Sequence, residues 1–308
     1  MNYEICVSII LVNWNTKELL KNCINSIIAE TKKISYEIIV VDNNSTDGSL
    51  EMIEKQFIDK IVLIKNHENR GFAAANNQAL KIAKGQFILM LNSDTIVLDN
   101  AVEKTINYLK NDTRIGLAGC KLLNADNTLQ YSCYNFNSII RAFLFKTKFI
   151  EFISKSTRYK YEGLITSFDY NENIEVDYVC GAYMLFSREV YEKVGLLDEN
   201  FFMYAEEADF CSRIKKNGYK VMFFSQASII HYGGGSSKRI NIISENRRII
   251  SRLLFIKKQK GTLYYHLYKI FSIFIVLMNI FRYSLTRNKE LTLEYKSKFS
   301  SIISMKYE

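Results

Sequence analysis

Residues 36–49 read Tyr36-Glu37-Ile38-Ile39-Val40-Val41-Asp42-Asn43-Asn44-Ser45-Thr46-Asp47-Gly48-Ser49, and their pattern is the clearest indication of the fold class. An apolar run rich in Ile and Val ends in an acid, and a turn of Asn, Ser, Thr and Asp leads into a segment with helical periodicity. This order predicts a buried strand, a polar turn and a helix. In an open α/β sheet, ligands bind in the crevice at the carboxyl ends of the strands. Asp42 is therefore a candidate for ligand binding, although turn chemistry alone also explains these residue types.

The same alternation continues on both sides of this stretch. We expect strands at Val7–Val12, Tyr36–Val41, Ile61–Lys65, Phe87–Leu91 and Ile115–Cys120, and helices from Thr16 as N-cap to Ile27 and at Ser49–Gln56, Ala73–Ala83 and Ala101–Lys110. Strands that alternate with helices of this length predict an α/β fold, in which helices flank a Rossmann-like, mostly parallel sheet with right-handed crossovers.

The pattern is less regular in the second half of the chain. From Tyr131 to Glu175, aromatic and basic residues mix without a clear period, which indicates either an insertion or helices that the pattern does not place. Beyond it we expect a strand at Val176–Phe186, helices at Ser187–Val194 and Asp209–Asn217 with Gly218 as the C′ residue, and short strands at Tyr219–Phe224 and Ser228–His231.

The positive charge is concentrated in the tail. Residues 238–308 contain 15 Lys and Arg against 4 Asp and Glu, a net charge of +11, whereas the whole chain carries +9. Aromatic and aliphatic residues are mixed with these cations, which favours an anionic membrane surface over nucleic acid as the partner. The apolar run from Ile270 to Phe281 is shorter than the ~20 residues of a typical span. We therefore expect an amphipathic helix that lies on the membrane; a packed helical subdomain is the alternative.

The six cysteines show no Cys-x-x-Cys pair and no zinc-like spacing. Residues 1–12 read as a strand rather than as a secretory signal. We therefore expect reduced thiols and a cytoplasmic protein.

Two further segments carry polar residues typical of a nucleotide and metal site. Asn92-Ser93-Asp94 follows a predicted strand, and hard cations such as Mg²⁺ take carboxylate and phosphate oxygens. Arg70 precedes small residues at the start of a predicted helix, where phosphate binds favourably. A helix cap at Asp94 and a solvated Arg70 are the structural alternatives.

A third acidic cluster follows an aromatic segment. Glu206, Glu207 and Asp209 lie within four residues, and repulsion among them is expected to raise at least one pKa, which suits a general base. Acids are also favoured in the first turn of a helix, which accounts for Asp209. His231 ends a predicted strand, where a metal ligand and a core histidine are both reasonable.

Taken in order, these segments resemble an inverting family 2 glycosyltransferase of the GT-A fold, and more narrowly the bacterial rhamnosyltransferase-like members that build O-antigen and capsule polysaccharides. The resemblance covers residues 6–237 and rests on Val-Asn-Trp-Asn at 12–15, Asp42 to Ser49, Asn69 to Asn77, Leu91 to Thr95 and the block from Val176 to Ser236. It implies a catalytic domain at 1–237, with a nucleotide-binding half at 1–120 and an acceptor-binding half at 121–237, before the basic helical tail at 238–308.

The resemblance also implies site residues. Nucleotide contacts are expected from Asn13, Asp42, Asn44, Arg70, Asn76, Asn92 and Ser93, and donor-sugar contacts from Asp177, Gly181 and Ala182. Asp94 and His231 match positions that hold Mg²⁺ or Mn²⁺, while Asn92 stands where many members have a first Asp. Glu207 falls where the family has a general base, and Glu206 beside it is the alternative.

The implied reaction is a single displacement. A carboxylate takes the proton of an acceptor hydroxyl as its oxygen attacks the anomeric carbon of a nucleotide sugar, either deoxythymidine diphosphate (dTDP) rhamnose or a uridine diphosphate (UDP) sugar. The expected acceptor is a lipid-linked glycan at the inner face of the cell membrane, where the protein would be peripheral. A nucleotidyltransferase remains an alternative, but the loop Asn13-Trp14-Asn15-Thr16 lacks the glycines of that class. A non-catalytic GT-A protein that binds glycan or membrane is another, and Asp94 and Glu207 argue against it.

Overall fold

The computed structural model describes residues 3–136, 163–233 and 241–304. The chain divides into two compact units. The first comprises Met1–Phe136, Leu164–Phe202 and Glu206–Ser236, and the second comprises Asn137–Gly163, Met203–Ala205 and Ser237–Glu308. The domain boundary expected between residues 237 and 238, and residues 137–162 of the irregular segment, lie outside the described residues.

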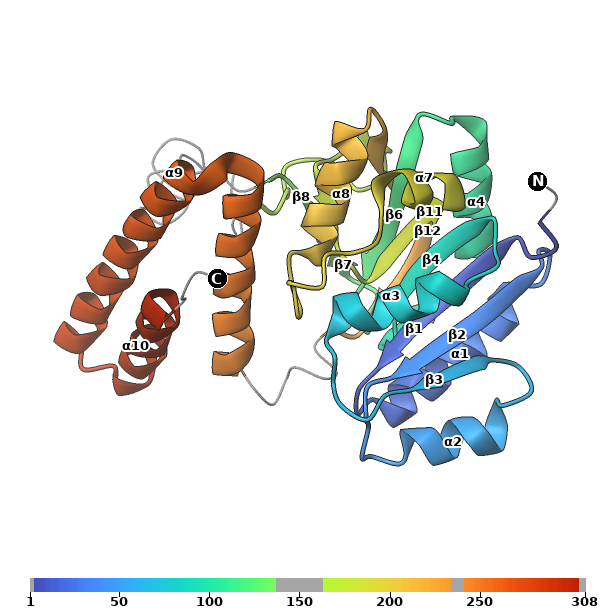
Figure 1. Cartoon of the computed structure of the whole chain (residues 1–308), viewed down its shortest axis with the longest axis horizontal. Coiled ribbons are helices and arrows are strands. Elements are labelled where there is room, and N and C mark those ends of the chain that lie inside the picture. Colours follow the sequence, from blue (N-terminus) through green and yellow to red (C-terminus); the bar gives the residue numbers. More distant parts are fainter. Residues whose placement is uncertain (1–2, 137–162, 234–240, 305–308) are drawn as a thin grey trace. The chain divides into compact units, whose positions relative to one another are not determined.

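A ten-stranded sheet forms the centre of the first unit (Figure 1), with the order β3-β2-β1-β4-β11-β6-β12-β5 and with β7 and β9 paired beside this path. The strands are β1 (Val7–Asn13), β2 (Tyr36–Asp42), β3 (Val62–Lys65), β4 (Phe87–Asn92), β5 (Thr95–Val97), β6 (Ile115–Leu123), β7 (Leu129–Gln130), β9 (Ile174–Glu175), β11 (Tyr183–Ser187) and β12 (Lys220–His231). Strands β1 to β4 pair in parallel, as do β6 and β12, whereas β11 runs antiparallel to β4 and β6. The predicted α/β fold with a mostly parallel sheet is confirmed.

Helices cover both faces of this sheet. One core contains residues of α1 (Lys17–Glu30), α2 (Ser49–Gln56) and α4 (Ala101–Asn111), and the other contains residues of α3 (Phe72–Ile82), α7 (Arg188–Val194) and α8 (Glu206–Lys216). Ile9 belongs to the first core and Ile10 to the second, because successive residues of a strand point to opposite faces. Burial on both faces explains why the central strands read as continuous apolar runs.

Three expected elements differ in the structure. Helix α8 begins at Glu206 rather than Asp209, so Glu206 and Glu207 lie in its first turn. The strand expected at Val176–Phe186 is divided into β10 (Tyr178–Val179), which pairs with β8 (Cys133–Tyr134), and β11. The two short strands expected near residues 219–231 form one strand, β12, whose register shifts between Phe224 and Ser228. An irregularity inside a strand looks like a strand end in the sequence.

The N-terminus of α1 is capped differently from the prediction. Thr16 precedes the helix but makes no capping hydrogen bond with its side chain. Its hydroxyl donates to Asn13 Oδ1 at 2.7 Å. The N–H of Lys17 instead donates to the Asp47 carboxylate at 2.8 Å. Asp47 therefore serves the helix that precedes it in the chain, which local sequence rules do not reveal.

The tail packs into a helical unit of its own. It contains α9 (Asn241–Leu285), which is interrupted at Gly261 with φ +83°, and α10 (Lys289–Ser304). Its core comprises Leu253, Ile256, Tyr265, Tyr268, Val276 and Ile302.

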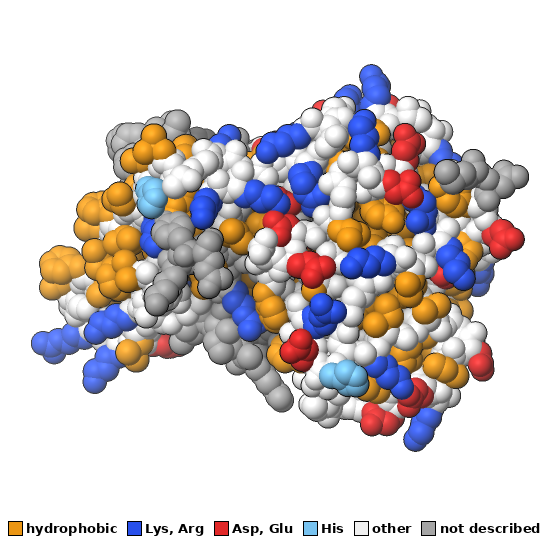
Figure 2. All heavy atoms as spheres, viewed as in Figure 1, with side chains coloured by type: hydrophobic (Ala, Val, Ile, Leu, Met, Phe, Trp, Pro, Cys, Tyr) orange, Lys and Arg blue, Asp and Glu red, His pale blue; other side chains and the backbone are white. Residues whose placement is uncertain are grey.

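One side of α9 remains apolar and exposed after this packing. Leu263, Leu267, Ile270, Phe274, Leu277, Met278, Phe281 and Leu285 are 47% to 76% exposed. Their spacing of mostly three or four residues places them on one side of a helix, which we call the apolar stripe. Figure 2 shows hydrophobic side chains gathered over α9. In the described part of the chain, Ser244–Leu285 is also long and apolar enough to cross a membrane, judged by length and composition alone.

Candidate functional site

The candidate site is built on the carboxyl ends of three neighbouring parallel strands. Asn13 of β1 is in register with Asp42 of β2, and Val12 of β1 is in register with Asn92 of β4. The three strands therefore end together, and the segment from Asn92 to Asp94 reaches the same edge as Asn13 and Asp42. This is the edge at which open α/β sheets bind ligands.

A polar network fixes this edge. Asn13 Nδ2 donates to Asp42 Oδ1 at 2.7 Å and to the Ser45 hydroxyl at 2.9 Å, and the Ser45 N–H donates to Asp42 Oδ2 at 2.8 Å. The Thr16 hydroxyl lies 3.0 Å from that of Ser93. Three of the expected nucleotide-binding residues, Asn13, Asp42 and Ser93, are thus brought together. Asp42 and Asn13 have no exposed surface, so Ser45 and the exposed Asn44 form the solvent side of this turn.

The loop before α3 is tied to the same turn. Asn43, next to Asp42, donates to Asn69 Oδ1 and to the Gly71 carbonyl, both at 3.2 Å. Arg70 lies between these two partners and is exposed. The structure therefore holds an exposed arginine beside the Asp42 turn. Both phosphate binding and the solvated alternative agree with this exposure, so the role of Arg70 stays a prediction.

Two residues at the N-terminus of α3, Gly71 and Asn76, make contacts within the protein itself. The close backbone approach at Gly71 is made by the protein itself, because a Cβ there would lie 2.4 Å from the Phe202 carbonyl oxygen. That oxygen also accepts the N–H of Phe72 at 2.7 Å. Asn76 is 1% exposed and donates to the Phe72 carbonyl within its own helix at 2.9 Å. Asn76 therefore has a structural explanation, and we leave it out of the site.

Asp94 and His231 form a pair that fits a divalent cation. Asp94 Oδ1 lies 3.4 Å from His231 Nε2, and the side chains are 11% and 12% exposed. Two ligands at adjacent positions of an octahedral ion with bonds of about 2.1 Å lie about 3 Å apart. No group of three or more His, Cys, Asp or Glu side chains that could hold a metal occurs among the described residues. A cation at this pair would thus take its remaining ligands from phosphate oxygens and water.

The adjacent acids at the start of α8 lie in different environments. Glu206 is 5% exposed, and its Oε2 has no hydrogen-bond partner. Burial first, and the neighbouring Glu207 charge second, raise the pKa of the Glu206 carboxyl well above its usual range. Glu207 is only partly buried. The pair therefore consists of a buried carboxyl group and a partly exposed side chain whose Oε2 is itself buried.

Gly181 and Ala182 connect the two parts of the site. A Cβ built on Gly181 would lie 3.8 Å from the Glu207 Cβ, so the backbone at Gly181 passes beside Glu207. The Ala182 carbonyl accepts the N–H of Asn92 at 3.1 Å. Asn92 is two residues before Asp94, and its side-chain nitrogen lies 3.4 Å from His231 Nε2. Gly181 thus lies beside Glu207, and the next residue, Ala182, bonds to Asn92 at the end of β4, next to the Asp94–His231 pair.

Two of the acids belong to structural networks. Asp177 lies 3.3 Å from the Lys215 ammonium and accepts the Phe136 N–H at 2.8 Å. Lys215 is eight residues after Glu207 on α8, about 12 Å along the helix axis, so Asp177 is not brought to the Glu207 end. We therefore leave Asp177 out of the site.

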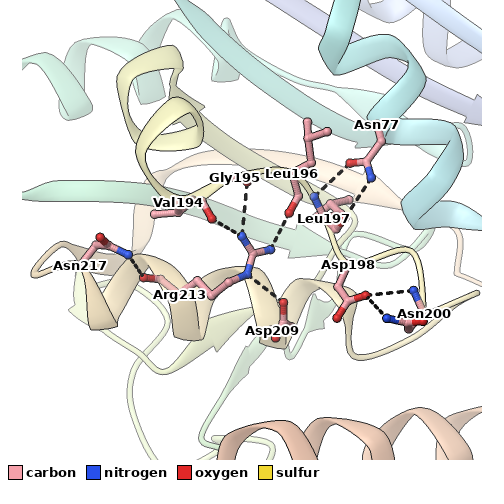
Figure 3. A network of polar contacts seen from close by, with 10 residues as sticks. All are labelled: Asn77, Val194, Gly195, Leu196, Leu197, Asp198, Asn200, Asp209, Arg213 and Asn217. Atoms are coloured by element: carbon pink, nitrogen blue, oxygen red, sulfur yellow. Dashed lines mark hydrogen bonds and ion pairs between the residues drawn. The ribbon is translucent and has the colours of Figure 1, made fainter. Parts of the chain in front are cut away.

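Asp209 pairs with Arg213 at 2.9 Å and has no exposed side-chain surface. The Arg213 guanidinium also donates to the carbonyls of Val194, Gly195 and Leu196 (Figure 3). It thereby satisfies the C-terminus of α7, which agrees with the structural interpretation of Asp209.

Residues 8–195 match the family described as Glycosyl transferase family 2, more than half of the chain. The chain belongs to glycosyl transferase family 2. This family 2 chain is 27% identical over 242 residues to the O-antigen biosynthesis protein RfbC of Myxococcus xanthus, with 78% of this chain and 18% of that protein covered. It is 26% identical over 263 residues to the low-salt glycan biosynthesis hexosyltransferase Agl10 of Haloferax volcanii, with 82% of this chain and 77% of that protein covered. The chain spans less than half the length of several curated relatives that it matches.

The fold of this family 2 chain is similar to that of mannosyltransferase PcManGT from Pyrobaculum calidifontis, solved in complex with GDP-Man and Mn²⁺. The TM-score is 0.56 at 15% sequence identity, with 100% of this chain and 80% of that chain covered. The GT-A fold expected from the sequence is therefore confirmed.

Proposed function

We propose that this chain transfers a sugar from a nucleoside diphosphate sugar to a hydroxyl group of a glycan, with inversion at the anomeric carbon. The observation that carries this proposal is that two consecutive residues join the two parts of the site. Gly181 lies beside Glu207, and Ala182 bonds to Asn92 at the end of β4, next to the Asp94–His231 pair. A donor held between these groups would have its diphosphate at one end and a base for the acceptor at the other. Family membership and the relatives in glycan synthesis support the same reaction class.

In this proposal the donor nucleotide binds along the edge of β1, β2 and β4. Asn44 and Ser93 contact the base and ribose, and the buried Asn13 and Asp42 hold the turn that carries Asn44. Arg70 binds the phosphates as an exposed cation beside that turn. The sugar then lies against the partly exposed Gly181, which has no side chain, while Ala182 is fully buried and fixes the backbone behind it.

Asp94 and His231 would hold Mg²⁺ or Mn²⁺, with Asn92 beside them. Such an ion, when bound, neutralises charge on the diphosphate and stabilises the leaving group. The 3.4 Å spacing of the two ligand atoms and the Mn²⁺ complex of PcManGT support this assignment.

Glu207 would act as the general base, with Glu206 as its buried neighbour. Burial, and then the charge of Glu207, raise the pKa of Glu206 well above its usual range, which disfavours the charged form of Glu206 and makes Glu207 the better candidate for the base. Glu207 takes the proton from the acceptor hydroxyl as that oxygen bonds to the anomeric carbon. The bond from that carbon to the phosphate oxygen breaks in the same step, and the nucleoside diphosphate leaves.

The donor we propose first is dTDP-rhamnose, with UDP-sugars next, and the acceptor is a lipid-linked glycan of the cell surface. The choice of donor rests on the resemblance of residues 176–236 to rhamnosyltransferase-like members of the family. The choice of acceptor rests on relatives such as RfbC. The apolar stripe, together with the cationic tail, supports peripheral attachment to the inner face of the membrane.

A donor screen tests this function. Purified protein with Mn²⁺ is offered a panel of nucleotide sugars, and release of the nucleoside diphosphate is measured with and without EDTA. We expect release from dTDP-rhamnose or a UDP-sugar that EDTA abolishes. A panel from which no donor is consumed, with or without a glycan acceptor, would contradict the proposal.

A further inference from the structure

The side chain of Gln130 is fixed next to His231 by two hydrogen bonds. Its Nε2 donates to Asn124 Oδ1 at 3.0 Å and to the backbone carbonyl of His231 at 3.2 Å. Asn124 is held in turn, since its Nδ2 donates to the Thr128 hydroxyl at 2.9 Å. Because the amide nitrogen has two acceptors, the Gln130 amide can take only one orientation, with Oε1 directed at the histidine ring.

This orientation determines which nitrogen of His231 carries the proton. Gln130 Oε1 lies 2.6 Å from His231 Nδ1. An amide oxygen accepts hydrogen bonds and cannot donate them, so the proton of a neutral imidazole is on Nδ1. The lone pair is then on Nε2, the nitrogen that lies 3.4 Å from Asp94 Oδ1. Which nitrogen of a histidine binds a metal is set by the hydrogen bond that the other nitrogen makes.

Two neighbours of His231 Nε2 act in opposite directions. The amide nitrogen of Asn92, at 3.4 Å, can only donate and favours a lone pair on Nε2, whereas the Asp94 carboxylate is a strong acceptor and attracts a proton on Nε2. Removing Gln130 therefore shifts the balance toward the opposite tautomer. An Nε2–H bonded to Asp94 would leave no lone pair for a cation between the two side chains. Since His231 and Asp94 are 12% and 11% exposed, little water is present to compete for that proton. Two acceptors therefore compete for one histidine proton, and the outcome decides whether the pair can bind a metal.

We propose that Gln130 is a positioning residue that holds the Nδ1–H tautomer of His231 and so keeps Nε2 available to the divalent cation. This inference rests on the metal site of the proposed function and adds a residue to it from β7, outside the motifs that define the family resemblance. Partners that orient a metal-ligating histidine commonly contribute ~10- to 100-fold to metal affinity. Gln130 contacts neither donor nor acceptor in this account and acts only through His231.

The tautomer can be observed directly in the full-length, metal-free protein. The chain contains three histidines, so two-bond ¹⁵N–¹H correlation spectra show three imidazoles, and His231→Ala identifies the one of interest. We expect His231 in the Nδ1–H form in the wild type and a shift toward Nε2–H in Gln130→Met, which keeps the side-chain length but removes the amide. A His231 that stays in the Nδ1–H form in Gln130→Met would overturn the proposal.

Metal affinity is the second measurement, made by titrating Mn²⁺ in the presence of UDP and following free Mn²⁺ by electron paramagnetic resonance. Gln130→Met should weaken Mn²⁺ binding by ~10- to 100-fold and should have no further effect in the His231→Ala background. Gln130→Glu, which keeps an acceptor at Nδ1, should bind Mn²⁺ at least as tightly as the wild type. A purely structural role for Gln130 would instead weaken binding in both variants.

Thr128→Val serves as the matched control. It disturbs the same hairpin by removing the hydroxyl that holds Asn124, while Gln130 and His231 keep their direct contact. We expect the tautomer and the Mn²⁺ affinity of this variant to match those of the wild type. A wild-type chain that binds no Mn²⁺ would refute the metal site itself, whereas unchanged affinity in Gln130→Met, with intact binding by the wild type, would refute only the role of Gln130.

Discussion

At the residue scale, Glu206 and Glu207 have the same chemistry and differ in burial. The family resemblance places the general base at Glu207, but the residue types alone do not distinguish the two adjacent acids. Burial is a property of the folded chain, set here by the start of α8 at Glu206 rather than at Asp209. In the proposed reaction the partly exposed Glu207 is the better candidate for the base, and this assignment stays a prediction.

This preference predicts unequal effects of two matched substitutions. Glu207→Gln should lower the turnover number at least ~100-fold, in line with the contribution of a general base, while the affinity for the nucleotide stays close to that of the wild type. Glu206→Gln is the control, because it has the same shape and burial already disfavours the charged form of this carboxyl. Turnover and nucleotide binding are measured for both. If Glu206→Gln were the inactive variant and Glu207→Gln the active one, the role would move by one residue.

The raised pKa of Glu206 also predicts how stability depends on pH. Above about pH 4.5, the ordinary pKa of this carboxyl, the unfolded chain releases the proton that the folded chain retains. The free energy of unfolding should then fall as pH rises, by at most about 1.4 kcal/mol per pH unit from this group, until the pH passes the folded pKa. Glu206→Gln lacks the titrating carboxyl and therefore this pH-dependent loss of unfolding free energy. Its stability relative to the wild type should then increase with pH. Urea unfolding across this range measures the difference, and parallel pH profiles for the two proteins would contradict the burial of Glu206.

At the scale of elements, the strands of the first half were predictable because each is buried on both faces and reads as an apolar run. The short strands were not, since β7 and β8 have two residues each and no period can be read from two residues. Gln130 belongs to this group, and its role depends on a partner 101 residues away. Asp47 capping α1 from 30 residues away is another contact that local sequence rules do not contain.

Arg213 joins α7 and α8, and its removal should be costly. Arg213→Met leaves Asp209, which has no exposed side-chain surface, as a buried charge without its cation. Breaking one partner of such a pair costs ~3–5 kcal/mol. Arg114→Met is the control, since Arg114 forms a 2.8 Å pair with Asp112 but is 71% exposed, and we expect a loss below ~1 kcal/mol. Similar unfolding free energies for the two variants would refute the importance of the network in Figure 3.

At the scale of the whole molecule, the sequence indicated a basic helical tail, and the structure adds that the tail has both a core of its own and an exposed apolar stripe. A self-contained core and an exposed stripe together favour a surface that docks elsewhere. The cations of the tail favour an anionic membrane as that surface.

Two charges placed on the stripe should prevent this docking. The double variant Leu267→Glu and Phe274→Glu changes residues that are 52% and 57% exposed, so the fold of the tail should be retained. We expect sedimentation with vesicles of anionic lipid for the wild type and loss of it in this variant. Thr262→Glu with Thr286→Glu adds the same charge at exposed positions off the stripe and should still bind. A wild-type chain that never binds such vesicles would refute membrane attachment.

The candidate site was predicted from the sequence as a set of residues, and the fold selects among them. Asn13, Asp42 and Ser93 meet because three parallel strands end together, which strand order predicts in principle. Asp177 and Asn76 match motif positions equally well, but an ion pair with Lys215 and a hydrogen bond within α3 account for them. Motif matching cannot separate residues that hold a loop from residues that hold a ligand.

The most direct test of the central claim, a nucleotide site completed by a metal ion, is the affinity for UDP and dTDP measured by calorimetry with and without Mn²⁺. In the wild type, Mn²⁺ should increase the affinity for at least one of these nucleotides by ~10-fold or more, because a cation held by Asp94 and His231 also binds the diphosphate. Asp94→Ala should abolish this increase, and His231→Ala should reduce it. Nucleotide affinity that is the same with and without Mn²⁺, or an increase that persists in Asp94→Ala, would contradict the account.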